Sequence, residues 1–234
     1  MKRIILKISN IHRKACVLLS FHLVSLLFLS CTVDSYETGE GSYSQMVADF
    51  ADLYTDAQKN GISFVTDEGS SYTLTTPIRA SWIDAANSIY RTSIYYNKVA
   101  EGVANPIACG YILVLQPKEP SEFKRQPQDP LGVESCWLSK NGKYLNLGLL
   151  VKNGRDNEGV EGSHALALVQ DEIHLNDDNT YTIYYRLLHD KGDSPEYYTN
   201  RRYVSILLPE DNRPDSVRIT ITTYDGDYVK TIKL

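Results

Sequence analysis

The amino-acid sequence predicts an all-β protein, and three observations support this fold class. Tyr, a residue that strands favour, occurs 17 times in 234 residues. Gly, Pro, Asn and Asp separate short apolar runs, as they do at turns between strands. Several of these runs alternate apolar and polar residues with a period of two, which is the pattern of a strand with one buried face.

Residues 1–30 are expected to be a lipoprotein signal peptide. They hold five basic residues and no acidic one, and an apolar run over 15–29 ends at Ser30, directly before Cys31. This is the layout of a secretory signal. The Leu-Ser-Cys ending resembles the lipobox of bacterial lipoproteins, although Phe28 stands where that pattern usually has Leu. The resemblance implies that Cys31 is lipidated and becomes the first mature residue.

Two alternatives to lipidation remain open, a membrane-spanning signal anchor and cleavage without a lipid. A spanning helix needs about 20 apolar residues, which is more than this run offers. We therefore expect a lipid at Cys31, followed by a polar tether over residues 31–44. The expected location is the cell envelope at the outer membrane, with the periplasmic or surface face left open.

Residues 45–116 are expected to form a small barrel. The segment 43–55 also fits one face of a helix, but the Lys59-Asn60-Gly61 turn that follows favours a strand and a hairpin. Four further strands are expected over 62–66, 72–78, 88–99 and 106–115, the last apolar on both faces, as in a central strand. Five short strands separated by turns predict an OB-like barrel.

Residues 117–130 contain four prolines and are expected to be an extended linker. In residues 131–234, period-two alternation predicts strands, most clearly over 143–152, 181–188 and 217–223. The dipeptides between the alternating runs are typical of hairpin turns, namely Asn141-Gly142, Asp178-Asn179 and Asp225-Gly226. About seven strands without a helical period predict an antiparallel β-sandwich.

Two cysteines, Cys109 and Cys136, remain in the mature chain besides Cys31. In an oxidising compartment they could form a disulfide that stabilises the fold by about 3 to 4 kcal/mol. The alternative is a pair of buried free thiols that pack as small apolar side chains. The sequence favours the free thiols, since nothing in it brings the two residues together.

The charge of the mature chain argues against nucleic acid as a partner. The chain has 24 basic and 29 acidic residues, and residues 1–30 hold five of the basic and none of the acidic ones. The remainder therefore has 19 basic and 29 acidic residues, a net charge of −10. Nucleic-acid binding depends on clustered Lys and Arg. The expected partners are the membrane, through the lipid, and an unknown protein or neutral glycan.

No recognised catalytic, metal or cofactor motif occurs in the sequence. His164, His174 and His189 show none of the usual ligand spacings, and Ser163 beside His164 is a chance neighbour, because a triad is assembled by geometry. No P-loop, dinucleotide-binding motif or nucleophile elbow is present. We expect a non-enzymatic protein without a metal or cofactor.

The aromatic residues are the remaining candidates for function. We expect Trp82, Tyr90 and Tyr95 to pack in the first core and Trp137 in the second, since Tyr and Trp are ordinary sheet residues. Tyr197 and Tyr198 follow a loop sequence and are the candidate ligand-contacting aromatics. Stacking on a sugar ring or anchoring a protein interface are the roles that such rings could serve.

Several segments resemble the NigD-like lipoproteins of Bacteroidales, over nearly all of the mature chain. They are residues 41–56 (GSYSQMVADFADLYTD), 65–69 (VTDEG), 90–98 (YRTSIYYNK), 129–152 (DPLGVESCWLSKNGKYLNLGLLVK) and 195–209 (PEYYTNRRYVSILLP). The resemblance implies an N-terminal OB-like domain followed by a C-terminal β-sandwich, and no established enzyme activity. It leaves a binding or assembly role, a glycan-binding accessory role and a bacteriocin-immunity role as alternatives.

Overall fold

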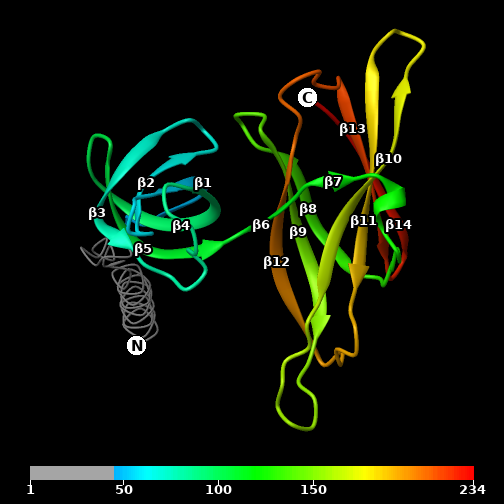
Figure 1. Ribbon diagram of the computed structural model, residues 1–234, viewed down its shortest axis with the longest axis horizontal. Coiled ribbons are helices and arrows are strands. Elements are labelled where there is room, and N and C mark those ends of the chain that lie inside the picture. Colours follow the sequence, from blue (N-terminus) through cyan, green and yellow to red (C-terminus); the bar gives the residue numbers. More distant parts are fainter. Residues whose placement is uncertain (1–44) are drawn as a thin grey trace, which may run out of the picture. The chain divides into compact units, whose positions relative to one another are not determined.

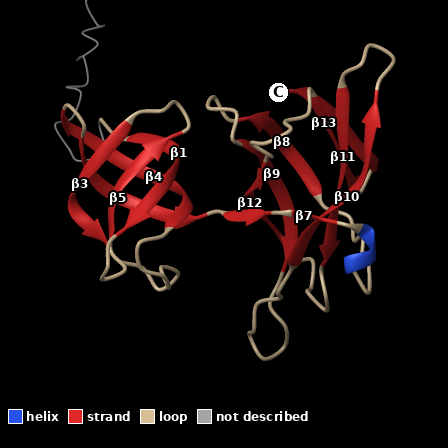
Figure 2. Ribbon diagram, turned by 45° about the horizontal axis from the view of Figure 1, so that its top comes forward, coloured by secondary structure: helices blue, strands red, loops and turns tan. Residues whose placement is uncertain are grey.

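The computed structural model describes residues 45–234. The expected signal peptide, lipidated Cys31 and tether therefore lie outside the described residues. The described chain is all-β, with a closed five-stranded barrel followed by two further sheets (Figures 1 and 2). The predicted fold class, an OB-like barrel followed by a sandwich, is confirmed.

The barrel consists of β1 (Val47–Thr55), β2 (Gly61–Thr66), β3 (Ser71–Ile78), β4 (Ile89–Ala100) and β5 (Val103–Tyr111), which close in the order β1-β2-β3-β5-β4. The ambiguous first segment is a strand, because β1 pairs with β4 from Val47 to Tyr54 and with β2 from Ala51 to Thr55. Lys59 takes a positive φ at the predicted Lys59-Asn60-Gly61 turn, and Gly69 does so at the turn between β2 and β3. The barrel core includes Leu53, Phe64 and Ile94.

The chain passes from the barrel to the sandwich at Ile112. The strand expected over 106–115 is two strands, because β5 ends at Tyr111 and β6 (Leu113–Leu115) pairs in parallel with β12 (Tyr198–Leu207). The side chain of Ile112 is buried, and its N–H donates to the carbonyl of Arg91. This run is apolar on both faces because it contributes to two different folding units in turn.

The sandwich consists of two sheets. One has the order β14 (Gly226–Lys233), β13 (Ser216–Thr223), β11 (Tyr181–Asp190), β10 (Ala165–Leu175) and β7 (Pro117–Lys118). The other has the order β6, β12, β9 (Tyr144–Asn153) and β8 (Gly132–Leu138). The hairpins are antiparallel, while the β11–β13, β10–β7 and β12–β6 pairs are parallel.

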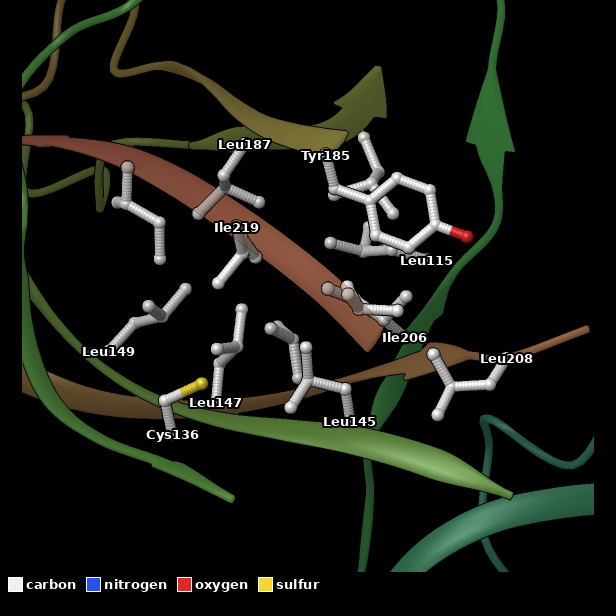
Figure 3. Close-up of a cluster of buried hydrophobic side chains, with 14 of the residues drawn as sticks. Leu115, Cys136, Leu145, Leu147, Leu149, Tyr185, Leu187, Ile206, Leu208 and Ile219 are labelled. Atoms are coloured by element: carbon white, nitrogen blue, oxygen red, sulfur yellow. The ribbon is translucent and has the colours of Figure 1, made fainter. Parts of the chain in front are cut away.

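The core of the sandwich lies between these two sheets. Figure 3 shows Leu145, Leu147 and Leu149 of β9 pointing toward Tyr185 and Leu187 of β11. These leucines alternate along β9, as the sequence predicted, and all are fully buried. The predicted turns are also present, because Gly142, Asn179 and Gly226 all have positive φ between paired strands.

The segment expected to be a linker, 117–130, is bound to the sandwich along much of its length. Pro117 and Lys118 pair with Leu168 and Val169 of β10, and the 3₁₀ turn η1 (Pro120–Glu122) follows. Further on, the backbone of His189 exchanges hydrogen bonds with Pro127 and Asp129. Proline lacks a backbone N–H, but a parallel pairing at a sheet edge leaves its carbonyl free to accept. The four prolines therefore mark an edge segment of the sandwich.

Candidate functional site

A buried polar network joins the barrel to the sandwich around Arg91 of β4, which is 3% exposed. Its two terminal nitrogens donate to the two carboxylate oxygens of Asp67, at 2.6 and 2.7 Å. Its Nη2 also donates to Asn146 Oδ1 of β9 at 3.2 Å, and its Nε to Ser205 Oγ of β12 at 3.3 Å. Such two-pronged pairing of Arg with a carboxylate is strong and fixes geometry.

Asp52 of β1 makes a second set of contacts across the same junction. Its carboxylate accepts from Lys143 Nζ at 2.7 Å and from the Tyr144 hydroxyl at 3.0 Å. The guanidinium of Arg91 lies over the ring of Tyr144, 4.1 Å from its centre. Burial, with the nearby charge of Asp52, raises the pKa of Tyr144, so its hydroxyl stays a donor. The charges in this network are paired, and their role is to hold the junction.

An aromatic groove lies beside this network and is lined by residues of both folding units. It has a volume of about 200 Å³, and its lining residues are Ala48, Asp49, Phe50, Ser93, Tyr95, Trp137 and Tyr203. The centre of the Phe50 ring is 5.5 Å from that of Trp137 and 5.2 Å from that of Tyr203. These are the distances of favourable aromatic pairs. The barrel and the sandwich thus share one aromatic cluster.

The rings of the groove are partly open to solvent. Trp137 is 37% exposed, Tyr203 36% and Tyr95 39%. Tyr203 pairs across the sheet with Gly148, where an added side chain would meet both the Tyr203 ring and Ser135. Glycine at this position makes room mainly for the Ser135 hydroxyl, which an added Cβ would overlap, while the Tyr203 ring would lie at an ordinary contact distance. The groove presents these rings to any molecule that enters it.

Two of the predictions for aromatic residues were wrong. Trp137 was expected in the core, but it lies on the outer face of β8, because a bulge between Val133 and Ser135 turns Cys136 inward instead. Tyr95 was also expected in a core, but its neighbour Tyr96 takes that place and is 1% exposed. In contrast, the other two predicted core aromatics, Trp82 and Tyr90, pack against the barrel core.

The candidate ligand-contacting residues Tyr197 and Tyr198 are exposed, by 77% and 41%. The structure does not bring them to the aromatic groove. Tyr198 precedes Tyr203 by five strand residues, which is a distance of about 17 Å. The rings that do meet in the groove, Phe50 and Tyr203, were missed. The sequence held one indication of the position of Tyr203. Its neighbour Val204 is a buried strand residue, and alternation along the strand then places the Tyr203 side chain on the outer face.

A histidine pair occupies another part of the sandwich. His164 Nδ1 lies 2.9 Å from His189 Nε2, and His164 Nε2 lies 3.1 Å from the hydroxyl of Ser194. His189 Nδ1 faces the carbonyl of Asp129, which can only accept, so its Nε2 accepts from His164. Burial is the main cause that lowers the pKa of His164. The serine that contacts His164 is therefore the buried Ser194, and not its sequence neighbour Ser163.

The two cysteines are free thiols in separate cores. Cys109 of β5 packs against the barrel core, and Cys136 of β8 lies in the sandwich core. Burial raises the pKa of both thiols to about 11. The structure therefore shows two free thiols, the half-buried Cys109 and the buried Cys136, with no bridge between them.

The described residues hold neither a cluster of metal ligands nor a membrane-spanning helix. Within residues 45–234, no group of three or more His, Cys, Asp and Glu side chains is placed to hold a metal ion. Over the same residues, no helix has the length and apolar character needed to cross a bilayer.

No protein-family model matches the chain, and no curated protein matches it significantly. Solved structures do share its fold. A NigD-like immunity protein from Bacteroides caccae has a TM-score of 0.60 and 20% identity, over 80% of this chain and 91% of its own. A protein of unknown function from Bacteroides vulgatus has a TM-score of 0.59 and 15% identity, over 80% of this chain and 91% of its own.

A predicted lipoprotein from Bacteroides fragilis is also similar, with a TM-score of 0.55 and 14% identity, over 81% of this chain and 97% of its own. These identities are low, so the likeness concerns the fold. It extends over nearly the whole length of each solved protein. The overall fold of the chain is consistent with that of the NigD-like proteins, as its sequence resemblance implied.

Proposed function

We propose that the protein is a lipid-anchored, non-catalytic component of the cell envelope, held at the outer membrane, that binds a ligand in the aromatic groove. The anchor rests on the basic and apolar leader and on Cys31 after Leu29 and Ser30. The fold shared with a predicted lipoprotein of Bacteroides fragilis supports a lipid-anchored protein of the cell envelope. The tether over residues 31–44 gives the binding unit reach from the membrane.

The observation that carries the binding role is the construction of the groove from both folding units. Phe50 and Tyr95 come from the barrel, and Trp137 and Tyr203 come from the sandwich. The Arg91 network fixes the junction beside them, so the groove is formed before a ligand arrives. A preformed concave site with aromatic walls and a few polar groups is the usual form of a small-ligand site.

The anchor is tested by expressing the full chain in a Bacteroides host, with Cys31→Ala and Cys16→Ala variants. Cys16→Ala is the matched control, because this cysteine lies within the apolar run of the leader. We expect the parent and Cys16→Ala in the outer-membrane fraction, and Cys31→Ala released or retained with its leader. Membrane attachment of Cys31→Ala equal to that of the parent, with the leader removed, would refute the lipid anchor.

The face of the membrane is read from the same cells. Protease added to intact cells removes a surface-exposed protein and spares a periplasmic one. Either result fixes where the ligand must be sought. An outer-membrane association that is lost in high salt would contradict the lipid anchor, because acyl chains hold through apolar burial and do not respond to salt.

A further inference from the structure

We propose that the aromatic groove binds one neutral sugar ring of a glycan. This inference rests on the proposed binding role and names the class of ligand. It follows from the size of the groove, from the orientation and exposure of its rings, and from the Ser93 hydroxyl and the absence of charge on its walls.

The size of the groove favours a single small ring. Its volume is about 200 Å³, whereas pockets for drug-sized ligands usually hold about 300–1,000 Å³. A stable protein interface would instead cover about 800 Å² on each partner. A narrow groove with open sides accepts one ring of a longer chain, and the neighbouring units can continue into solvent.

The aromatic walls suit the apolar face of a sugar. The face of an aromatic ring is electronegative, and the C–H bonds on one side of a pyranose carry a small positive charge. Trp137, Tyr95 and Tyr203 are all more than a third exposed within one small groove. The Trp137 and Tyr203 rings are nearly perpendicular, with an interplanar angle of 86° and centres 6.3 Å apart. They therefore form two adjoining walls of a corner.

The Ser93 hydroxyl on the barrel wall can meet a hydroxyl of such a ring. Ser93 lines the groove and pairs with Phe50, so the two side chains share the outer face of the barrel. Asp49 pairs with the fully buried Ile94, and its carboxylate accepts from the Tyr96 hydroxyl at 2.8 Å, so this charge lies on the inner face of the barrel. The other lining residues carry no charge, which suits an uncharged ring. Since residues 31–234 have a net charge of −10, a neutral sugar fits better than an acidic one.

The experiment detects binding through the fluorescence of Trp137, which lines the groove. The chain has two tryptophans, and Trp82 packs in the barrel against Tyr90 and Tyr111. In a Trp82→Phe variant, Trp137 is the one remaining tryptophan, so the tryptophan fluorescence comes from the groove alone. It is titrated with maltohexaose, cellohexaose, xylohexaose, mannohexaose and galactohexaose, each up to about 5 mM, which reveals Kd values to about 1 mM. An oligogalacturonate and a mixture of tetrapeptides complete the panel.

Three further variants in the same background locate the binding. Tyr203→Ala removes a wall of the groove and is expected to weaken binding about tenfold or more. Tyr203→Phe keeps the ring and should bind nearly as well as the parent. Tyr181→Ala is the matched control, because Tyr181 is also an exposed strand tyrosine but belongs to β11, outside the groove. Far-ultraviolet circular dichroism and thermal unfolding confirm that each variant folds.

The expected result is a saturable change in Trp137 fluorescence with at least one neutral oligosaccharide, lost in Tyr203→Ala and kept in Tyr181→Ala. Equal binding by Tyr203→Ala and the parent would overturn the groove as the site. A response to tetrapeptides or to the oligogalacturonate, with none to neutral sugars, would overturn the sugar and leave the binding role standing. No response to any ligand of the panel would overturn both.

Discussion

Replacing Arg91 with Met should cost about 3 kcal/mol of the free energy of unfolding. The change removes both hydrogen bonds to Asp67 and the bonds to Asn146 and Ser205. Breaking a buried ion pair by removing one partner costs about 3 to 5 kcal/mol, because the other charge is left uncompensated. The lower end applies here, since the Asp67 side chain is 15% exposed and water can reach it.

The assay is urea unfolding of the chain from residue 32 onward, followed by tryptophan fluorescence and circular dichroism. Arg201→Met is the matched control, because Arg201 pairs with Glu134 on the surface, where ion pairs contribute little. We expect its unfolding midpoint to stay at that of the parent. If Arg91→Met lost no more stability than Arg201→Met, the network could not be what holds the junction.

A double variant shows how much of the stability lost in Arg91→Met comes from the unpaired charge of Asp67 and how much from lost packing. Arg91→Met combined with Asp67→Leu removes both charges and leaves apolar groups in their place. Exchanging a buried ion pair for apolar side chains is often neutral. We therefore expect the double variant to recover most of the stability that Arg91→Met loses. A further loss in the double variant would show that shape, and not charge, dominates at this position.

Three other outcomes follow from the structure. Tyr185→Phe should raise the free energy of unfolding by about 1 kcal/mol and the melting temperature by about 2–4 °C, because the buried hydroxyl of Tyr185 has no partner among the described residues. A lower melting temperature would show that this hydroxyl is bonded. Since burial lowers the pKa of His164, the unfolded chain binds more protons than the folded chain below about pH 6.5. The free energy of unfolding should therefore fall from pH 7 toward pH 5, and less steeply in His164→Asn. Equal pH dependence in the parent and the variant would rule His164 out as the cause. At pH 8 the thiol of the buried Cys136, whose pKa burial raises to about 11, should react with a thiol reagent only after unfolding, and the half-buried Cys109 should react slowly in the folded chain. Rapid labelling of Cys136 in the folded chain would contradict its burial.

The local pattern of the sequence predicted most strands and the turns between them. The alternating leucines of β9 and the Asn141-Gly142 turn depend on neighbouring residues alone, so they could be recognised without the fold. The passage of the chain from the barrel to the sandwich at Ile112 could not be recognised from the sequence, because an apolar run has the same pattern whether it packs in one core or in two. The edge strand β7 was missed for a related reason, since its pairing partner β10 lies about fifty residues further on.

The candidate site was harder to predict than the fold. The sequence predicted Trp137 in the core because Trp is an ordinary sheet residue. The bulge that turns its side chain outward depends on the pairing between β8 and β9, which neighbouring residues do not reveal. The meeting of Phe50 with Tyr203 depends on how the barrel and the sandwich contact each other. The exposure of Tyr197 and Tyr198 could be read from their loop sequence, but exposure alone did not place them in a site.

The central claim is that the barrel and the sandwich build one binding site. It is tested most directly by measuring the Kd of one responding neutral oligosaccharide for Phe50→Ala and for Tyr203→Ala, which alter opposite walls of the junction. The account predicts that both variants bind at least about tenfold more weakly, and that the double variant loses less than the sum of the two free-energy changes, because the rings touch. Weakening by one variant alone, with the other equal to the parent, would contradict a site shared between the two units.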